Sequence, residues 1–277
     1  MFLTKKKNTV NIVAQKDSWI LEKLARQLDD VLPYTIWSGV PTGKSDVTYY
    51  INYVQAGRTK ASKVECALFT HYEERDSTLS NKWWQVAGQV EVAVCMSEMY
   101  SKMLSKRKIT TKLIPPGVDL EKYTPRNIKI GVVGTTKVTG RKGEDIIKSI
   151  MDIPGIELSF TGGTGWPADG NFIPENDMPN FYRGLDYVLI ASYYEGGPMC
   201  AIEALACGIP VIAPAVGWVP ELPHIKFDRG NKADLRRVLL SIVNDKNKLR
   251  ESVIERSWDE YIRKHDMLFK ELLIMAQ

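Results

Sequence analysis

Two glutamates, Glu195 and Glu203, stand eight positions apart, and an apolar run begins between them. Two glycines and Pro198 follow the first glutamate directly. Glycine lets a backbone approach a ligand closely, and proline suits the first position of a helix. A carboxylate can accept two hydroxyl hydrogens at once, and burying it without a partner is costly. The pattern predicts a helix over 198–206 that buries Glu203 among apolar residues and brings both carboxylates to a ligand rich in hydroxyl groups. The alternative is a helix glutamate, Glu203, paired with a lysine.

A basic, glycine-rich segment, TTKVTGRKGED (135–145), follows a strand-like run over 128–134. Arg141 and Lys142 come just before the start of a helix in this segment. Free backbone N–H groups at a helix start attract anions, and adjacent cations strengthen the attraction. The segment therefore predicts a cradle for a diphosphate. It matches neither the P-loop pattern nor G-x-G-x-x-G, and the alternative is a mobile basic loop.

Strand-like and helical runs alternate along the chain in two series. The expected strands are 9–14, 47–54, 64–70, 90–96, 128–134, 156–162, 187–192 and 209–214, and the expected helices start near Ser18, Ser97, Lys142, Pro198 and Lys246. The first helix carries Trp19, Ile20, Leu24, Leu28 and Val31, and the last runs to Leu273. Apolar strands between helices favour parallel sheets covered on both faces. Ligands then bind beyond the carboxyl ends of the strands, where both site segments lie.

A proline-rich break, IPPGVDLEKYTPRN (114–127), separates the two series. Neither a helix nor a central strand tolerates that density of prolines. We therefore expect an α/β protein with two Rossmann-like domains, 1–125 and 126–255, and a last helix over 256–277.

Five segments together resemble glycosyltransferase family 4, whose fold is GT-B. They are EGGPMCAIEALACGIPVIAPAVGWVPEL (195–222), which is similar to the E-x7-E region of that family, GVVGTTKVTGRKGEDII (131–147), MPNFYRGLDYVLIAS (178–192), the linker IPPGVDLEKYTP (114–125) and FTHYE (69–73). The resemblance covers the C-terminal half well and the N-terminal half loosely. A front domain of about 125 residues is typical of compact bacterial or phage-type members.

The resemblance implies a role for each matching position. Glu195 would bind hydroxyls of the transferred sugar with the backbone of Gly196, Gly197, Pro198 and Met199, and Glu203 would bind the ribose diol. Arg141 and Lys142 would neutralise the diphosphate, and His71 would touch the donor sugar or the acceptor. The base would lie near Ile173 in NFIP (171–174). The last helix would pack back on the N-terminal domain, and the two sheets would face each other across a cleft.

One position departs from the family pattern. The family often has an arginine directly after the glycine that ends this strand, whereas here Gly134 is followed by Thr135, Thr136 and Lys137. Either Lys137 or Arg141 then replaces that charge, or phosphate binding is weaker, and we favour Arg141.

The resemblance implies a retaining, metal-independent hexosyltransferase-like enzyme that moves a sugar from a nucleotide sugar, such as a UDP- or GDP-sugar, to a hydroxyl. No cofactor and no metal are expected, since D-x-D, H-E-x-x-H and cysteine clusters are missing. Family members are thought to use front-face attack, in which the leaving phosphate takes the acceptor proton. The alternatives are a non-catalytic nucleotide-sugar or carbohydrate-binding module with a decayed phosphate site, a sugar-nucleotide epimerase and a NAD-dependent oxidoreductase. Of the other histidines, we expect His224 to be structural and His265 to lie at the surface.

The balance of charge differs between the halves. Residues 1–125 hold 18 Lys and Arg against 13 Asp and Glu, whereas the rest hold 19 against 20. A basic helix at 101–108 is compatible with an anionic membrane surface, with nucleic acid or simply with a solvated face. The acceptor stays open between a glycan, a lipid-linked glycan, a protein, a small molecule and modified DNA. No signal peptide or membrane span is expected, and the four cysteines are expected to be buried free thiols. We therefore expect a cytoplasmic protein, with peripheral contact at the inner membrane face as one option.

Overall fold

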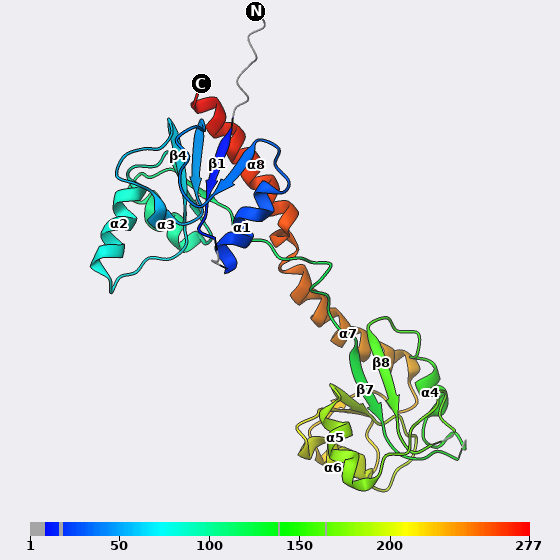
Figure 1. Cartoon of the computed structure of the whole chain (residues 1–277). Helices are drawn as coiled ribbons and strands as arrows, with labels where there is room; N and C mark the ends of the chain where they lie inside the picture. The colour runs from blue at the N-terminus through cyan, green and yellow to red at the C-terminus, as the bar shows by residue number, and fades with distance from the viewer. Residues whose placement is uncertain (1–8, 17–18, 138, 164) are drawn as a thin grey trace, which may run out of the picture. The chain divides into compact units, whose positions relative to one another are not determined.

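The computed structural model describes residues 9–16, 19–137, 139–163 and 165–277. The chain forms two compact units, each built on its own parallel sheet (Figure 1). Unit 1 holds the described residues of Met1–Tyr123 together with Val253–Gln277, and unit 2 is Thr124–Ser252. The divisions lie two and three residues before the expected ones (123 against 125, and 252 against 255). The expected pair of Rossmann-like α/β halves is confirmed, and such a pair fits the GT-B fold.

Six parallel strands in the order β2-β1-β3-β4-β5-β6 form the sheet of unit 1. Their bounds are β1 Val10–Val13, β2 Thr35–Ser38, β3 Val47–Tyr50, β4 Val64–Phe69, β5 Val92–Cys95 and β6 Thr111–Leu113. The four interior strands are buried along their whole length and are the four expected from their apolar runs. The sequence prediction missed β2 and β6, because edge strands are only partly buried and carry a weaker apolar signal.

Helices cover both faces of this sheet (Figure 1). They are α1 Trp19–Asp29, α2 Ser77–Ala87, α3 Glu98–Ser105 and α8 Trp258–Met275, with a short 3-10 helix at Tyr53–Gln55. α1 and α8 pack on one face through Leu24, Leu28, Leu268, Phe269 and Leu272. α2 and α3 pack on the other through Trp83, Val86, Ala87 and Leu104. The sheet is therefore buried between two helical layers, as expected.

The apolar stripe expected on the first helix is only partly buried. Leu24 and Leu28 are buried, whereas Trp19, Ile20 and Val31 are exposed. The helical spacing correctly located α1, which buries Leu24 and Leu28 in the core and ends at Asp29, before Val31.

The last expected helix, 246–273, is wrong as a single element. α7, Lys232–Glu251, belongs to unit 2, and α8 starts anew at Trp258 in unit 1. A 3-10 turn, Ile254–Arg256, separates them. The Ser257 hydroxyl then accepts a hydrogen bond from the Glu260 N–H at 3.1 Å, as a helix-capping serine does.

His265 is fully buried, so its expected place at the surface is wrong. Its Nε2 lies 2.9 Å from the Tyr49 hydroxyl, and its Nδ1 lies 2.9 Å from the Tyr261 carbonyl oxygen. The imidazole packs among the rings of Tyr49, Tyr261 and Phe269. Its charged neighbours Lys264 and Asp266 are partly exposed, and only the packing of α8 on the sheet shows that His265 between them is buried.

Five parallel strands in the order β11-β10-β9-β7-β8 form the sheet of unit 2. They are β7 Ile128–Val132, β8 Ile156–Phe160, β9 Tyr187–Leu189, β10 Val211–Ala213 and β11 Ile225–Lys226. α4 Glu144–Lys148 and α7 cover one face, and α5 Met178–Arg183 and α6 Met199–Ala206 cover the other. Short 3-10 helices lie at Glu175–Asp177 and Val219–Glu221. The expected strands are confirmed, whereas β11, α5 and most of α7 were not predicted.

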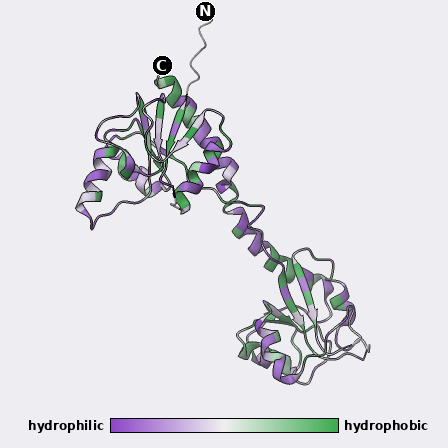
Figure 2. Ribbon diagram, viewed as in Figure 1, coloured by the Kyte–Doolittle hydropathy of each residue, from purple (hydrophilic) through white to green (hydrophobic). Residues whose placement is uncertain are grey.

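Hydropathy follows this layering. Figure 2 shows purple and green along the same helices in both units, which is the mark of one solvent face and one packed face. Among the described residues, no helix is long and apolar enough to cross a membrane. The four cysteines are free; Cys66 and Cys95 are buried as expected, whereas Cys200 and Cys207 are partly exposed.

Candidate functional site

The candidate site lies where the strands of the unit 2 sheet end. Because the strands are parallel, the segments that follow β7, β8, β9 and β10 leave the same edge of the sheet. These segments carry the two site patterns, 134–143 after β7 and 190–198 after β9. They meet although about fifty residues separate them along the chain.

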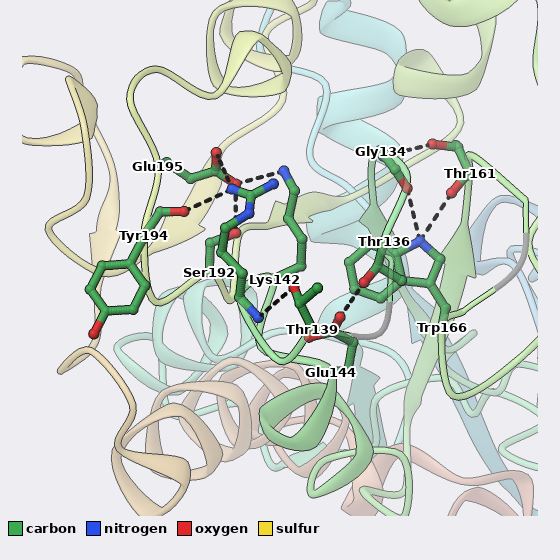
Figure 3. Close-up of polar contacts among 11 residues, drawn as sticks. Gly134, Thr136, Thr139, Lys142, Glu144, Thr161, Trp166, Ser192, Tyr194 and Glu195 are labelled. Atoms are coloured by element: carbon green, nitrogen blue, oxygen red, sulfur yellow. Dashed lines mark hydrogen bonds and ion pairs between the residues drawn. The ribbon is translucent and has the colours of Figure 1, made fainter.

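Glu195 is the centre of a charged cluster at this edge (Figure 3). Lys142 Nζ lies 2.6 Å from Glu195 Oε1, and Arg141 Nη1 lies 3.1 Å from Glu195 Oε2. The Ser192 hydroxyl donates to Oε1 at 2.8 Å, and Arg141 also donates to the Tyr194 carbonyl oxygen at 2.9 Å. The Glu195 side chain is 10% exposed and that of Lys142 20%. The structure thus brings together three side chains predicted for the site.

Glu195 is ionised in this setting. Burial alone would raise the pKa of its carboxyl group. The hydrogen bonds from Lys142 and Ser192 and the positive charges of Lys142 and Arg141 outweigh burial, so the pKa lies below its usual value. The cluster therefore holds a carboxylate against two cations.

The loop after β7 packs closely on the segment after β9, and this contact brings Arg141 and Lys142 next to Glu195. Gly143 caps α4 with φ of +77°, and a Cβ there would lie 2.2 Å from the Ala191 carbonyl oxygen. Only glycine fits that contact and that backbone conformation. The Tyr193 N–H donates to the Arg141 carbonyl oxygen at 2.9 Å, next to this contact. Gly143, which the sequence analysis did not single out, thereby joins the basic loop to the strand end.

The loop after β7 is tied to the loop after β8. Trp166 Nε1 donates to the carbonyl oxygens of Gly134 and Thr161, at 2.8 and 3.1 Å, and the Gly134 N–H donates to Thr161 Oγ1 at 3.1 Å. The Thr136 hydroxyl donates to Glu144 Oε1 (Figure 3). Thr135 and Lys137 are exposed and lie outside the Glu195 cluster. Of the two cations that could replace the missing arginine, Arg141 is the one beside Glu195.

Replacing Trp166 with phenylalanine should destabilise the protein by about 1–2 kcal/mol, since two backbone acceptors lose a shared donor. The melting temperature of the full chain, measured by calorimetry, should fall by a few degrees. Trp218→Phe is the matched control, because the buried Trp218 Nε1 has no hydrogen-bond partner among the described residues. Equal losses in both variants would mean that the Trp166 hydrogen bonds do not hold the loop.

The start of α6 is built from close contacts between glycines and their neighbours. A Cβ on Gly197 would lie 2.5 Å from the Trp218 ring, so this ring packs directly on the backbone. Gly217 packs equally closely on the Gly196 carbonyl oxygen. Pro198 was expected at the first helical position and instead precedes it, because α6 begins at Met199. The Met199 side chain is exposed.

Glu203 is exposed, so the expectation that it is buried among apolar residues is wrong. The buried residues of α6 are Ala201 and Ala204, and Glu203 lies on the opposite face beside the exposed Ile202. Its Oε2 accepts a hydrogen bond from the Tyr182 hydroxyl at 2.5 Å, so its partner is a tyrosine rather than a lysine. Its apolar sequence neighbours suggested burial, but the orientation of the helix exposes this position.

Two further predicted residues, Ile173 and His71, stand on other segments of the chain. Ile173 is partly buried in the segment before α5, next to the exposed Phe172. His71 belongs to unit 1, where it is exposed just after β4, with its Nδ1 3.1 Å from the Thr70 hydroxyl. Their binding roles stay predictions.

The basic helix expected over 101–108 is shorter in the structure, because α3 ends at Ser105 and the last three basic residues lie in the turn that follows. Lys102 pairs with Glu98 at 2.6 Å, and the Arg107 guanidinium lies 3.6 Å from the centre of a Trp84 ring. Contact between this basic surface and an anionic partner, such as a membrane or nucleic acid, stays a prediction.

Sequence reasoning missed Ser192, Tyr182, Trp166 and the Thr136–Glu144 pair. Ser192 could have been found, since it ends the expected strand 187–192 next to the glutamate segment. Tyr182 and Trp166 carry no signal in the sequence, because their hydrogen bonds reach segments that only the fold brings close. Among the described residues, no three His, Cys, Asp or Glu side chains gather where they could hold a metal ion.

Comparison with known proteins adds a family similarity to this geometry. Residues 170–258 match the family model of glycosyl transferases group 1. That range includes Tyr182, Glu195 and Glu203 and leaves Arg141 and Lys142 outside. A D-inositol 3-phosphate glycosyltransferase of Mycobacterium sp. (strain KMS) is 29% identical over 144 residues, which cover 39% of this chain and 32% of that protein. Its counterpart in Mycobacterium marinum is 30% identical over 142 residues, and that match covers 39% of this chain and 30% of the other protein.

The chain spans about a third of the length of these curated relatives. Among solved structures, sucrose-phosphate synthase from Thermosynechococcus elongatus is 19% identical with a TM-score of 0.37, over 83% of this chain and 74% of the other. Anabaena Alr3699/HepE in complex with UDP is 13% identical with a TM-score of 0.42, and the match covers 96% of this chain and 100% of the other. The sequence similarities support a glycosyltransferase.

Proposed function

We propose that this protein is a retaining, metal-independent glycosyltransferase of family 4, which moves a sugar from a nucleotide sugar to a hydroxyl acceptor. The observation that carries the proposal is the cluster of Glu195 with Lys142 and Arg141 at the carboxyl edge of the unit 2 sheet. Glu195 lies in the segment that matches the glycosyl transferases group 1 model, and the two cations come from the neighbouring loop.

The cluster suits a substrate that carries both a diphosphate and hydroxyl groups. Glu195 pairs with both cations. A diphosphate brings more negative charge than one carboxylate and would compete for Lys142 and Arg141. Glu195 would then be free to accept hydrogen bonds from sugar hydroxyls.

The same cations would assist the chemical step. When the bond between the sugar and the phosphate breaks, negative charge builds up on the leaving diphosphate, and fixed cations stabilise that charge. In the front-face mechanism the leaving phosphate takes the proton of the acceptor hydroxyl. The protein then supplies position and charge rather than a nucleophile.

The rest of the donor would extend along α5 and α6. Glu203 is exposed and can accept hydrogen bonds from the ribose diol, and the base would lie near 171–174. His71 of unit 1 would serve the donor sugar or the acceptor, which we propose binds to unit 1. The second candidate function is a non-catalytic binding module, which was suggested by the missing arginine after Gly134. The cluster does not favour this alternative, because Arg141 supplies a positive charge beside Glu195.

Thermal-shift titrations test donor binding. UDP, GDP, ADP, TDP and their common sugar conjugates would be added to the full chain, with NAD as the probe for the oxidoreductase alternative. A ligand at a hundred times its Kd adds about 2.7 kcal/mol. We expect a shift of a few degrees with one nucleotide and a larger one with one of its sugars. No shift with any nucleotide sugar would contradict the proposal.

Two alanine variants separate the parts of the donor. Glu203→Ala should weaken nucleotide binding about tenfold, through loss of the ribose contacts. Glu195→Ala should instead reduce the preference for the conjugated sugar over the free nucleotide. Glu251→Ala, an exposed glutamate at the end of α7, is the matched control. Unchanged binding and turnover in both variants would refute these roles.

Slow hydrolysis or transfer of the sugar then tests the reaction itself. NMR of the released sugar, recorded before it mutarotates, shows whether the anomeric configuration is retained. Activity is measured in EDTA and again after Mg²⁺ or Mn²⁺ has been added in excess over the EDTA, which tests metal independence. An inverted product, or activity that returns only with metal, would overturn those parts of the proposal.

A further inference from the structure

Tyr182 is a buried tyrosine whose polar end reaches the edge of the proposed donor site. The residue is 1% exposed and lies on α5, packed in the core cluster under α6 with Val188, Ala201 and Ala204. A buried tyrosine hydroxyl normally needs a hydrogen-bond partner. Here that partner is Glu203 Oε2, at 2.5 Å.

The hydroxyl stays a donor over the whole physiological pH range. Burial, followed by the hydrogen bond to the Glu203 carboxylate, raises the pKa of Tyr182 well above its usual value. The ring is fixed by the core, so the donor is fixed as well. Tyr182 thus offers Glu203 a hydrogen bond in one place only.

Glu203 itself is exposed, and an exposed glutamate on a helix samples several side-chain rotamers. A fixed donor selects the rotamer in which Oε2 meets the hydroxyl, which leaves Oε1 for a ligand. A carboxylate that is already oriented loses less conformational freedom when a ligand binds. A hydrogen bond that only joined α5 to α6 would need no carboxylate at this position, since a neutral acceptor would do.

We propose that Tyr182 is the positioning residue for Glu203, and that it orients the carboxylate to recognise the two hydroxyls of a ribose. This inference rests on the proposed function and goes beyond it, because it assigns the choice of a ribonucleotide over a deoxyribonucleotide to a residue that does not touch the ligand. The substrate class is therefore a ribonucleoside-diphosphate sugar.

The test compares ribose with deoxyribose. Kd values for UDP, GDP and ADP and for their 2′-deoxy forms would be measured by calorimetry on the full-length parent, Tyr182→Phe, Glu203→Ala and the double variant. Tyr187→Phe is the matched control, because it removes the hydroxyl of a partly buried tyrosine on β9 that does not contact Glu203. Tyr182→Phe keeps the ring that packs in the core, so its melting temperature should fall by only a few degrees.

We expect the parent to bind its preferred ribonucleotide about tenfold more tightly than the 2′-deoxy form. Tyr182→Phe should weaken the ribonucleotide about tenfold and bring the ratio of the two Kd values close to one. The same change should add nothing in the Glu203→Ala background, and Tyr187→Phe should match the parent.

Three results would overturn the inference. If Glu203→Ala lost the preference for ribose while Tyr182→Phe kept it, the proposed function would stand and Tyr182 would have no positioning role. Equal weakening of the ribo and deoxy forms by Tyr182→Phe would show a general structural effect. If no nucleotide bound the parent, the inference would fall together with the proposed function.

Discussion

Lys142→Met should lower kcat/KM for sugar transfer by about 10²- to 10³-fold, the size of effect expected when one fixed group that stabilises transition-state charge is removed. Lys142 Nζ is the cation nearest to Glu195, and its side chain is mostly buried. A charge in such a setting is little screened by water, so its loss weakens the site more than the loss of an exposed charge would. Steady-state kinetics with the donor identified by thermal shift measures the effect.

Binding measurements locate the loss on the diphosphate. Lys142→Met should weaken a nucleoside diphosphate strongly and leave the affinity for the corresponding nucleoside unchanged. Arg141→Met should show a smaller loss, because the Arg141 side chain is about half exposed. Lys148→Met, an exposed lysine at the end of α4, is the control. Activity in Lys142→Met equal to that of the control would remove Lys142 from the mechanism.

The free energy of unfolding should fall by about 3 kcal/mol between pH 7 and pH 4 through His265 alone. Burial lowers the pKa of His265 from 6.5 to about 4, and the hydrogen bond to the Tyr261 carbonyl oxygen offsets this only in part. The Tyr49 and Tyr261 hydroxyls are the titratable groups packed against the imidazole. Since a carbonyl oxygen only accepts, Nδ1 carries the proton and Nε2 accepts from the Tyr49 hydroxyl.

The sign follows from proton uptake. Between pH 6.5 and pH 4 the unfolded chain binds a proton at this histidine, and the folded chain does not. The unfolded state is therefore favoured as the pH falls through that window. Above pH 6.5 neither state is protonated and the penalty is absent, and below pH 4 both are protonated and the penalty is complete.

Urea unfolding of the full chain at pH 7, 5.5 and 4.5 measures this dependence. His265→Gln removes the titrating group, so it should lower stability at pH 7 and flatten the fall toward pH 4.5. His71→Gln removes an exposed imidazole of the same unit and should keep the pH profile of the parent. A profile in His265→Gln as steep as that of the parent would assign the acid sensitivity to other groups.

The interior strands and the segments that follow them could be predicted from the sequence. Mostly apolar runs such as VNIV in β1 and VECALF in β4 are buried along their whole length, so their overall composition predicts that these strands lie in the interior of the sheet. Parallel strands bring their carboxyl ends to one edge. Glu195 and Lys142, 53 positions apart, could therefore be expected at one site before any contact was known.

Burial of single charged or polar residues could not be predicted in the same way. Glu203 follows an apolar run and is exposed, whereas His265 stands among charged residues and is fully buried. Neighbours in sequence on a helix point in different directions, so they say little about the face on which a residue lies. The same limit hid Tyr182, whose role depends on the packing of α5 beside α6.

The sequence by itself determined the alternation of strands and helices, the glycines and cations at the strand ends, and the resemblance that named a chemistry. Only the tertiary structure decided that Arg141 rather than Lys137 lies beside Glu195, that Tyr182 bonds to Glu203, and that α7 and α8 are separate helices. The physical reason is that backbone preference and apolar patterning act locally. Hydrogen bonds and burial, in contrast, depend on which distant segments pack against each other, and that is set only when the whole sheet and its helices come together.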